Sequence, residues 1–186
     1  MMKFANDRDL APSFREAMSR LAAGVTLITT CGSEGQALGM LATAVSSVTA
    51  DPPTILVCIN RTASIHRDLT ASGVFRANFL AEDQYEVAEC FASSKKRESR
   101  FQVGQWKTEP SGAPALIGAI ASLDCKLTEM VDIGTHSVIF GQVVSINLGH
   151  DDSDPLIYYA RNYCSLASSS RSGRVERSAD IKSAAM

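Results

Sequence analysis

The chain has 186 residues, of which 45% are hydrophobic and 20% are charged. This length fits one domain whose core buries most of the surface of the unfolded chain, and the composition is ordinary for a globular protein. The 18 basic residues nearly balance the 20 acidic ones, and the net charge of −2 argues against a dedicated nucleic-acid binder.

The cysteines and the N-terminus indicate the compartment. The five cysteines are far apart in the sequence and form neither a C-x-x-C motif nor a Cys/His pair at metal-binding spacing. An odd number without a framework is typical of free thiols in a reducing compartment. Charged residues at Asp7, Arg8 and Asp9 occupy the place where a signal peptide needs an apolar run, and no stretch is long enough to span a bilayer. We therefore expect a cytoplasmic protein, and we expect no metal site.

The first predicted element is a helix. Residues 1–12 have a mixed composition and are expected to form a flexible N-terminal segment. Ser13 and Glu16 then have the spacing of a capping box. The apolar residues of the following helix share one face, at Phe14, Met18 and Leu21. We expect this helix to pack on the core.

Strand signals dominate the rest of the chain. Runs rich in β-branched and apolar residues predict strands at Val25–Thr30, Ala37–Val45, Thr54–Ile59, Val74–Leu80, Ala121–Met130, Val138–Ile146 and Leu156–Tyr159. Two further helices are expected, at Ser64–Ala71 and Ala81–Ala92. Many short strands without βαβ alternation predict a closed antiparallel barrel, mainly β with a few helices, within residues 13–166. The Ser-rich residues 167–186 have no apolar period and predict a flexible tail.

The stretch from Gln36 to His66 carries the most informative pattern. Its two apolar strands are joined by a polar bridge that closes on Asp51-Pro52-Pro53, so the second strand should begin only after Pro53. The bridge combines hydroxyl groups with small residues whose backbone a planar ligand can approach closely. The turn at residues 60–64 opens a predicted helix, and free N–H groups at a helix start favour an anion such as phosphate.

Several common site motifs are absent from the sequence. It has no G-x-G-x-x-G after a strand and no G-x-x-x-x-G-K-[ST], which argues against the usual Rossmann and P-loop modes of nucleotide binding. It has no G-x-S-x-G either, and only three histidines to serve as bases. This scarcity of acid and base groups suits an enzyme whose cofactor carries the chemistry.

Several segments together resemble one known family. The segments ATAVSSVT, DPP and LVCIN lie in this order between Ala42 and Asn60, and FREAM at Phe14, DIGTH at Asp132 and PLIY at Pro155 extend the pattern. Together they resemble the short-chain NAD(P)H:flavin reductases, the reductase components of two-component aromatic monooxygenases such as the 4-hydroxyphenylacetate 3-monooxygenase reductase. The resemblance covers about residues 13–163 and implies an antiparallel split β-barrel of the FMN-binding type.

The resemblance also implies roles for individual residues. The positions that match flavin-binding residues of the family are Thr43, Ala44, Val45, Ser46, Asn60, Arg61, Ser64, Asn78, Phe91, Ala92 and Arg100. Among these, the turn at Asn60, Arg61 and Ser64 matches the phosphate site. The basic run that ends at Arg100 is either a flap over phosphate, which the resemblance favours, or a solvated loop.

The nicotinamide site is implied in the same way. His136 matches the histidine placed near the flavin face for the nicotinamide nucleotide, and we expect it to be the catalytic residue. Many relatives have Gly-Asp-His at this point, whereas this chain has Gly-Thr-His, as in the hydroxyphenylacetate-type branch. Tyr163 matches a near-terminal aromatic residue of the site, although core packing explains it equally well. His66 either helps to cap the phosphate turn or is a surface residue of the helix.

The implied function is an NAD(P)H:flavin oxidoreductase. It takes hydride from NADH or NADPH, reduces FAD or FMN, and supplies the reduced flavin to a partner monooxygenase that acts on an aromatic substrate. Two alternatives stay open: a flavin carrier or sensor without turnover, and a reductase whose bound flavin reduces another acceptor. We also expect a homodimer, because the apolar strand segments Val138–Phe140 and Leu123–Leu127 need a partner to cover them.

Overall fold

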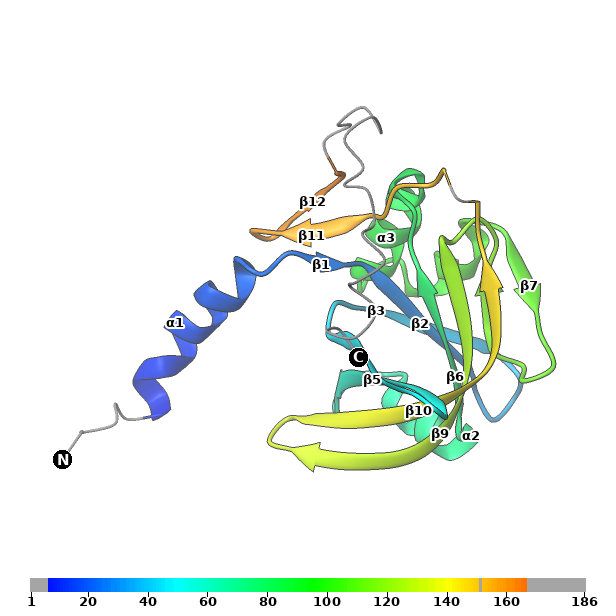
Figure 1. Cartoon of the computed structure of the whole chain (residues 1–186), viewed down its shortest axis with the longest axis horizontal. Coiled ribbons are helices and arrows are strands. Elements are labelled where there is room, and N and C mark those ends of the chain that lie inside the picture. The colour runs from blue at the N-terminus through cyan, green and yellow to red at the C-terminus, as the bar shows by residue number, and fades with distance from the viewer. Residues whose placement is uncertain (1–6, 151, 167–186) are drawn as a thin grey trace, which may run out of the picture.

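The computed structural model describes residues 7–150 and 152–166 (Figure 1). The helices are α1 (Asp7–Ser19), α2 (His66–Ser72) and α3 (Tyr85–Ala92), with 3-10 turns at Glu82–Gln84 and Arg97–Gln102. The strands are β1 (Ala23–Gly24), β2 (Thr26–Cys31), β3 (Ala37–Ala42), β4 (Val45–Ala50), β5 (Pro53–Asn60), β6 (Val74–Phe79), β7 (Trp106–Thr108), β8 (Pro114–Leu116), β9 (Ala121–Ile133), β10 (His136–Leu148), β11 (Ile157–Tyr159) and β12 (Asn162–Cys164). None of the helices in the described ranges has the length and apolar character needed to cross a membrane.

One antiparallel sheet of seven strands forms the body, in the order β3-β2-β6-β9-β10-β5-β4. Its two edge strands, β3 and β4, are consecutive in the chain and are separated only by Thr43 and Ala44. The sheet therefore curls until β3 contacts β5 (Figure 1). This confirms the predicted mainly β, antiparallel split barrel. No strand pairing among the described residues joins β3 to β4, so the expectation of a closed barrel is wrong at this edge.

The core lies on both faces of β2. Ile28 belongs to an apolar cluster inside the curled sheet, together with Val57 on β5 and Leu69 on α2. Its neighbour Leu27 points the other way, as alternate strand residues must. It packs in a second cluster with Phe91 on α3. The second cluster fixes α3 beside the strands that carry the β3–β4 connection.

An ion pair is buried within the sheet. Arg76 on β6 and Asp124 on β9 are cross-strand neighbours, and Arg76 Nη2 lies 2.9 Å from Asp124 Oδ2. Ser111 donates a hydrogen bond of 2.8 Å to the other carboxylate oxygen of Asp124. Because an unpaired charge in the core is costly, this pair fixes the register of β6 and β9 and ties the loop before β8 to them.

Helix α1 differs most from the sequence expectation. It begins at Asp7 rather than Ser13 and includes Pro12, so residues 7–12 are helical and Ser13 is not its N-cap. Figure 1 shows α1 extending away from the barrel rather than packing on the core. Residues 1–6 and the predicted flexible tail, 167–186, lie outside the described residues.

The β11–β12 hairpin holds the end of α1. The backbone N–H of Ala160 donates to the Ser19 carbonyl over 2.8 Å, and Arg161 Nη2 lies 3.2 Å from Glu16 Oε2. Both central residues of this turn have positive φ, 49° at Ala160 and 65° at Arg161, a conformation that non-glycine residues rarely adopt. The contacts with α1 help to hold this strained turn in place.

The polar bridge of the sequence turned out to be a strand. The predicted strand Ala37–Val45 ends at Ala42, and the residues after Ala44 form β4, which pairs with β5. Strand β4 is exposed along nearly its whole length, because it is an edge strand and carries serines and threonine. The short strands β1, β11 and β12 form a separate small sheet, of which the sequence predicted only β11.

Candidate active site

The β3–β4 junction, residues Ala42–Ser46, lies at the open edge of the barrel. Ala42 is buried at the end of β3, whereas Thr43, Ala44 and Ser46 are exposed. The Ala44 carbonyl accepts a hydrogen bond of 3.0 Å from the backbone N–H of Cys58, which anchors the junction to β5. Small side chains on a fixed, accessible backbone let a flat ligand approach closely.

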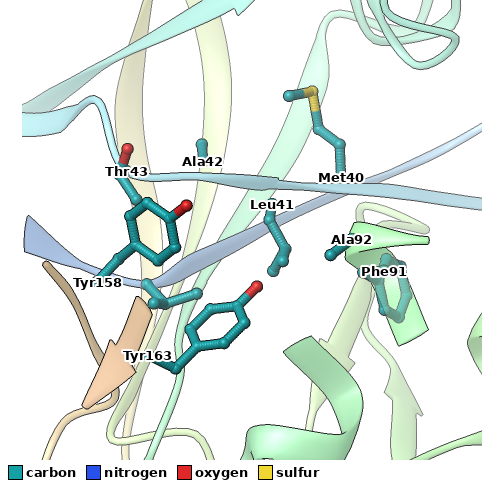
Figure 2. Close-up of a pocket in the computed structure, with 9 residues that line it drawn as sticks. Met40, Leu41, Ala42, Thr43, Phe91, Ala92, Tyr158 and Tyr163 are labelled. Carbon is teal, nitrogen blue, oxygen red and sulfur yellow. The ribbon is translucent and has the colours of Figure 1, made fainter. Parts of the chain in front are cut away.

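A cavity of about 340 Å³ opens on one side of this junction. We call it the tyrosine cavity, and it is lined by Val25, Met40, Leu41, Ala42, Thr43, Phe91, Ala92, Tyr158 and Tyr163. Figure 2 shows the rings of Tyr158 and Tyr163 reaching from the β11–β12 side toward Leu41 and Thr43. Thr43, Phe91, Ala92 and Tyr163, which the sequence assigned to the site, therefore share one cavity. Its volume lies in the range of about 300–1,000 Å³ that is usual for ligand pockets.

The two tyrosines give the cavity a polar edge on an apolar wall. The ring centroids of Tyr158 and Tyr163 are 5.4 Å apart in an edge-to-face arrangement. Burial, together with the charge of nearby Tyr158, raises the pKa of Tyr163 above its ordinary value of 10.0. The Tyr163 phenol therefore stays protonated at neutral pH and can donate a hydrogen bond to a ligand.

A second cavity of about 630 Å³ also borders the junction. We call it the barrel-end cavity. It shares Val25 and Thr43 with the tyrosine cavity, and it adds Val45 and Ser46 from the predicted site. Most of its wall is apolar, with Ile55 from β5 and Leu123 from β9 among the lining residues. Thr43, in the junction, therefore lines both cavities.

The predicted phosphate turn is ordered by its own hydrogen bonds. The side-chain oxygen of Asn60 accepts from the backbone N–H of Thr62 over 2.9 Å and from its hydroxyl over 2.8 Å. The backbone N–H of Arg61 donates to the Thr135 carbonyl over 3.0 Å. Arg61 and Ser64 are exposed at the surface of the turn. Helix α2 begins at His66 rather than at the predicted Ser64. The turn that carries Arg61 therefore precedes the helix, and Arg61 is exposed to solvent.

His136 lies beside this turn. It is the first residue of β10, where it pairs with Asn60 at the end of β5. Its ring Nδ1 is 2.9 Å from the Thr135 hydroxyl, and the imidazole is exposed. The predicted nicotinamide residue and the predicted phosphate turn are therefore adjacent, although they are far apart in the sequence. Neither lines the two cavities.

Comparison with known proteins decides the family. Residues 18–167 match the family described as flavin reductase like domain. The chain belongs to the flavin reductase family. The FMN reductase (NADH) RutF of Stutzerimonas stutzeri (strain A1501) is 44% identical over 156 residues, which are 84% of this chain and 88% of that protein.

Solved structures of flavin reductases share the fold. The NADH:FAD oxidoreductase SgcE6 of Streptomyces globisporus C-1027, in complex with NAD and FAD fragments, is 26% identical, with a TM-score of 0.80 over 91% of this chain and 99% of that one. BorF, the flavin reductase component of a bacterial two-component tryptophan halogenase, is 34% identical, with a TM-score of 0.76 over 84% of this chain and 98% of that one. These matches confirm the predicted family, fold and class of oxidoreductase, one that uses flavin and a nicotinamide nucleotide.

Two of the residues matched to flavin-binding positions, Asn78 and Arg100, donate hydrogen bonds to the protein itself. Asn78 is 0% exposed, and its amide group bonds to Leu27, Thr29, Leu116 and Ser122 within the core. Since its donors and its acceptor already have protein partners, the geometry does not support the predicted contact between Asn78 and flavin. The residue instead holds β2, β6, β8 and β9 together.

Arg100 contacts Phe91, one of the residues that line the tyrosine cavity. Its guanidinium donates to the carbonyl of Gly39 over 3.2 Å and to that of Ser93 over 3.1 Å, and it lies 5.5 Å from the centre of the Phe91 ring. Burial lowers the pKa of Arg100 from its ordinary value, but an arginine stays charged at neutral pH. A Cβ on Gly39 would lie 2.7 Å from the Phe91 ring, so only glycine admits this packing. The hydrogen bonds of Arg100, which lies in the 3-10 turn Arg97–Gln102, therefore anchor the basic segment.

Sequence reasoning missed some residues of the tyrosine cavity. Tyr158 and Met40 line the tyrosine cavity, yet the sequence placed them in ordinary strands. Tyr158 faces Tyr163 directly across the β11–β12 hairpin, so the hairpin register would have revealed it. Among the described residues, no group of three or more His, Cys, Asp or Glu side chains could hold a metal ion.

Proposed function

We propose that the chain is an NADH:flavin oxidoreductase that reduces FMN or FAD as a substrate and releases the reduced flavin to a separate monooxygenase acting on an aromatic compound. The observation that carries the proposal is the tyrosine cavity, around which Thr43, Phe91, Ala92 and Tyr163 gather. The relatives support it, since RutF is named for FMN and NADH and SgcE6 for FAD and NADH. NADH is accordingly proposed over NADPH.

The residues of the tyrosine cavity fit a flavin ring. Phe91 and the two tyrosines offer aromatic surface to a planar ring system, and Tyr163 keeps a hydroxyl donor for its polar edge. The backbone at Thr43 and Ala44 is accessible beside them. A bound flavin supplies the hydride-accepting chemistry, so the protein has to bind the ring, orient it and limit its contact with water. We assign the phosphate to the turn at Arg61.

A homodimer is part of the proposal. Exposed apolar side chains lie on α1 and on the β9–β10 pair, at Leu10, Phe14, Met18, Met130, Val131, Ile133, Val144, Ile146 and Leu148. Phe14, for example, is 64% exposed. Such surface usually marks a protein contact. A second copy over the β9–β10 face would also enclose His136, whose cross-strand partner is the exposed Ile133, and would complete the nicotinamide site at the contact.

Light scattering tests the dimer. We expect twice the chain mass at micromolar concentration with or without FMN, and Phe14→Asp should shift the protein toward monomer. A flavin-saturated monomer of the natural sequence would contradict this part of the proposal.

A separate partner enzyme that receives the reduced flavin is supported by BorF, which is the flavin reductase component of a two-component tryptophan halogenase. The five free cysteines support a reducing compartment, and we propose the cytoplasm.

NADH oxidation with added flavin tests the activity. We expect NADH absorbance to fall only when FMN or FAD is present, at a rate that saturates with flavin concentration. A carrier or sensor would bind flavin without consuming NADH. A reductase with permanently bound flavin would oxidise NADH at a rate that does not depend on added flavin, once its own acceptor is supplied.

A further inference from the structure

Three side chains behind the phosphate turn form a continuous hydrogen-bonded network. The His66 Nε2 atom lies 2.8 Å from the Ser137 hydroxyl oxygen. Ser137 in turn donates to Asp132 Oδ1 over 2.6 Å. Ser137 is 0% exposed, so neither of its contacts is replaced by water in the folded protein. We call these three residues the Asp–Ser–His network.

The hydrogen-bond directions follow from counting protons. A serine hydroxyl has one hydrogen, and here it is given to the Asp132 carboxylate. The Ser137 oxygen can therefore only accept from His66, whose ring carries its proton on Nε2. The hydroxyl lies between the carboxylate and the imidazole, which is the wrong order for activating a serine nucleophile. The network is therefore suited to positioning.

The Asp–Ser–His network positions the turn at Arg61. The second oxygen of Asp132 lies 3.6 Å from Arg61 Nε, and both side chains are about half exposed. Asp132 and Ser137 face each other across the β9–β10 hairpin, whereas His66 begins α2, directly after the turn. The turn is thus held at its start by the hairpin, through Asp132 and the Arg61 backbone contact with Thr135, and at its end by Ser137.

We propose that Asp132, Ser137 and His66 are positioning residues that preorganise Arg61 for the phosphate of FMN, and so set the preference for phosphorylated flavin over riboflavin. The inference rests on the proposed function, because it takes the turn at Arg61 as the phosphate site. The physical reason is that an arginine held in place loses less conformational freedom when it binds an anion. Asp132 fixes the guanidinium from the side of the hairpin, while the exposed part of the guanidinium stays open to the ligand.

Riboflavin separates positioning from a general structural effect, since it has the flavin ring but no phosphate. Dissociation constants for FMN and riboflavin are measured by the quenching of flavin fluorescence, and KM values for both with saturating NADH. For Ser137→Ala we expect about a fivefold weaker affinity for FMN, the size of one net hydrogen bond, and an unchanged affinity for riboflavin. The value of kcat with FMN should stay the same. Ser145→Ala, an exposed serine on the same strand, is the matched control and should change neither affinity.

A second pair of variants guards against misfolding at the buried serine. His66→Ala should weaken FMN binding in the same way, and His66→Gln should restore it, because the glutamine amide can still donate to Ser137. Ser137→Ala should add little to Arg61→Ala, since both act on the same contact. Equal losses for FMN and riboflavin, or no loss for either, would overturn the inference. A protein that binds FMN but never oxidises NADH would contradict the proposed function instead, and the two dissociation constants would still test the network.

Discussion

His136 lies directly opposite Asn60, where the first residue of β10 pairs with the last residue of β5. Directly opposed residues of an antiparallel pair point to the same face of the sheet. The imidazole and the turn that begins at Asn60 are therefore neighbours on the outward face. This arrangement places a histidine beside the proposed anion site at one end of the barrel, and it gives His136 a role that can be tested separately from flavin binding.

Replacing His136 should affect the nicotinamide nucleotide and not the flavin. For His136→Ala we expect kcat/KM for NADH to fall about tenfold, which corresponds to losing one hydrogen bond at the reacting centre. The dissociation constant for FMN should change less than about twofold, since the imidazole is not part of the tyrosine cavity and its hydrogen bond joins it to Thr135 rather than to Arg61. Steady-state kinetics and flavin fluorescence together make the comparison. An equal loss in FMN affinity would place His136 in the flavin site.

Filling the tyrosine cavity should block flavin. Ala92 is exposed at the end of α3 and also lines the cavity, so Ala92→Phe adds a ring to the cavity without disturbing the core. We expect the KM for FMN to rise at least about tenfold, with the melting temperature unchanged. Ala71→Phe, an exposed alanine on α2, is a control of the same size. Normal FMN kinetics in Ala92→Phe would show that the flavin binds elsewhere.

The buried ion pair should matter to stability far more than exposed pairs do. Asp124→Ala leaves the fully buried Arg76 without its carboxylate and should lower the free energy of unfolding by about 3–5 kcal/mol. Glu16→Ala removes the exposed partner of Arg161 and should cost less than about 1 kcal/mol. Urea unfolding of both variants measures the contrast. Similar losses in the two variants would mean that the buried pair contributes little.

Alkaline pH should weaken the fold through Cys125. Burial, with the nearby Asp124 carboxylate, raises the pKa of this thiol from 9.0 to about 12. Above pH 9 the unfolded chain loses the thiol proton while the folded protein keeps it, so stability falls as the pH rises toward 12. We expect the natural protein to lose about 1 kcal/mol more than Cys125→Ala between pH 8 and pH 10. Parallel losses in urea unfolding would rule out this contribution.

Part of the site could be predicted from the sequence because it depends on local order. The resemblance at Thr43 and Phe91 located two walls of one cavity, although the strands between them were only outlined. The tight Gly134-Thr135 turn fixes the register of β9 and β10, so even the contact between Asp132 and Ser137 could have been read from it. These features are set by neighbours in the chain.

The remainder depends on packing between distant segments. The bond from His66 to Ser137 joins the first residue of α2 to β10, far away in the sequence, and no local pattern reports it. The full burial of Asn78 follows from strands on either side of β6, which a single segment cannot reveal. The residue was assigned to the flavin by resemblance alone, and its amide proved to be committed to the core.

One anaerobic experiment tests directly whether reduced flavin leaves the protein. The protein is mixed with NADH and with FMN in large excess over protein, and the flavin that passes an ultrafiltration membrane is measured. We expect one FMN to be reduced for each NADH oxidised, until the excess is consumed, with the reduced FMN in the filtrate. Reduction that stops at one flavin per protein chain, with that flavin retained by the membrane, would contradict this expectation.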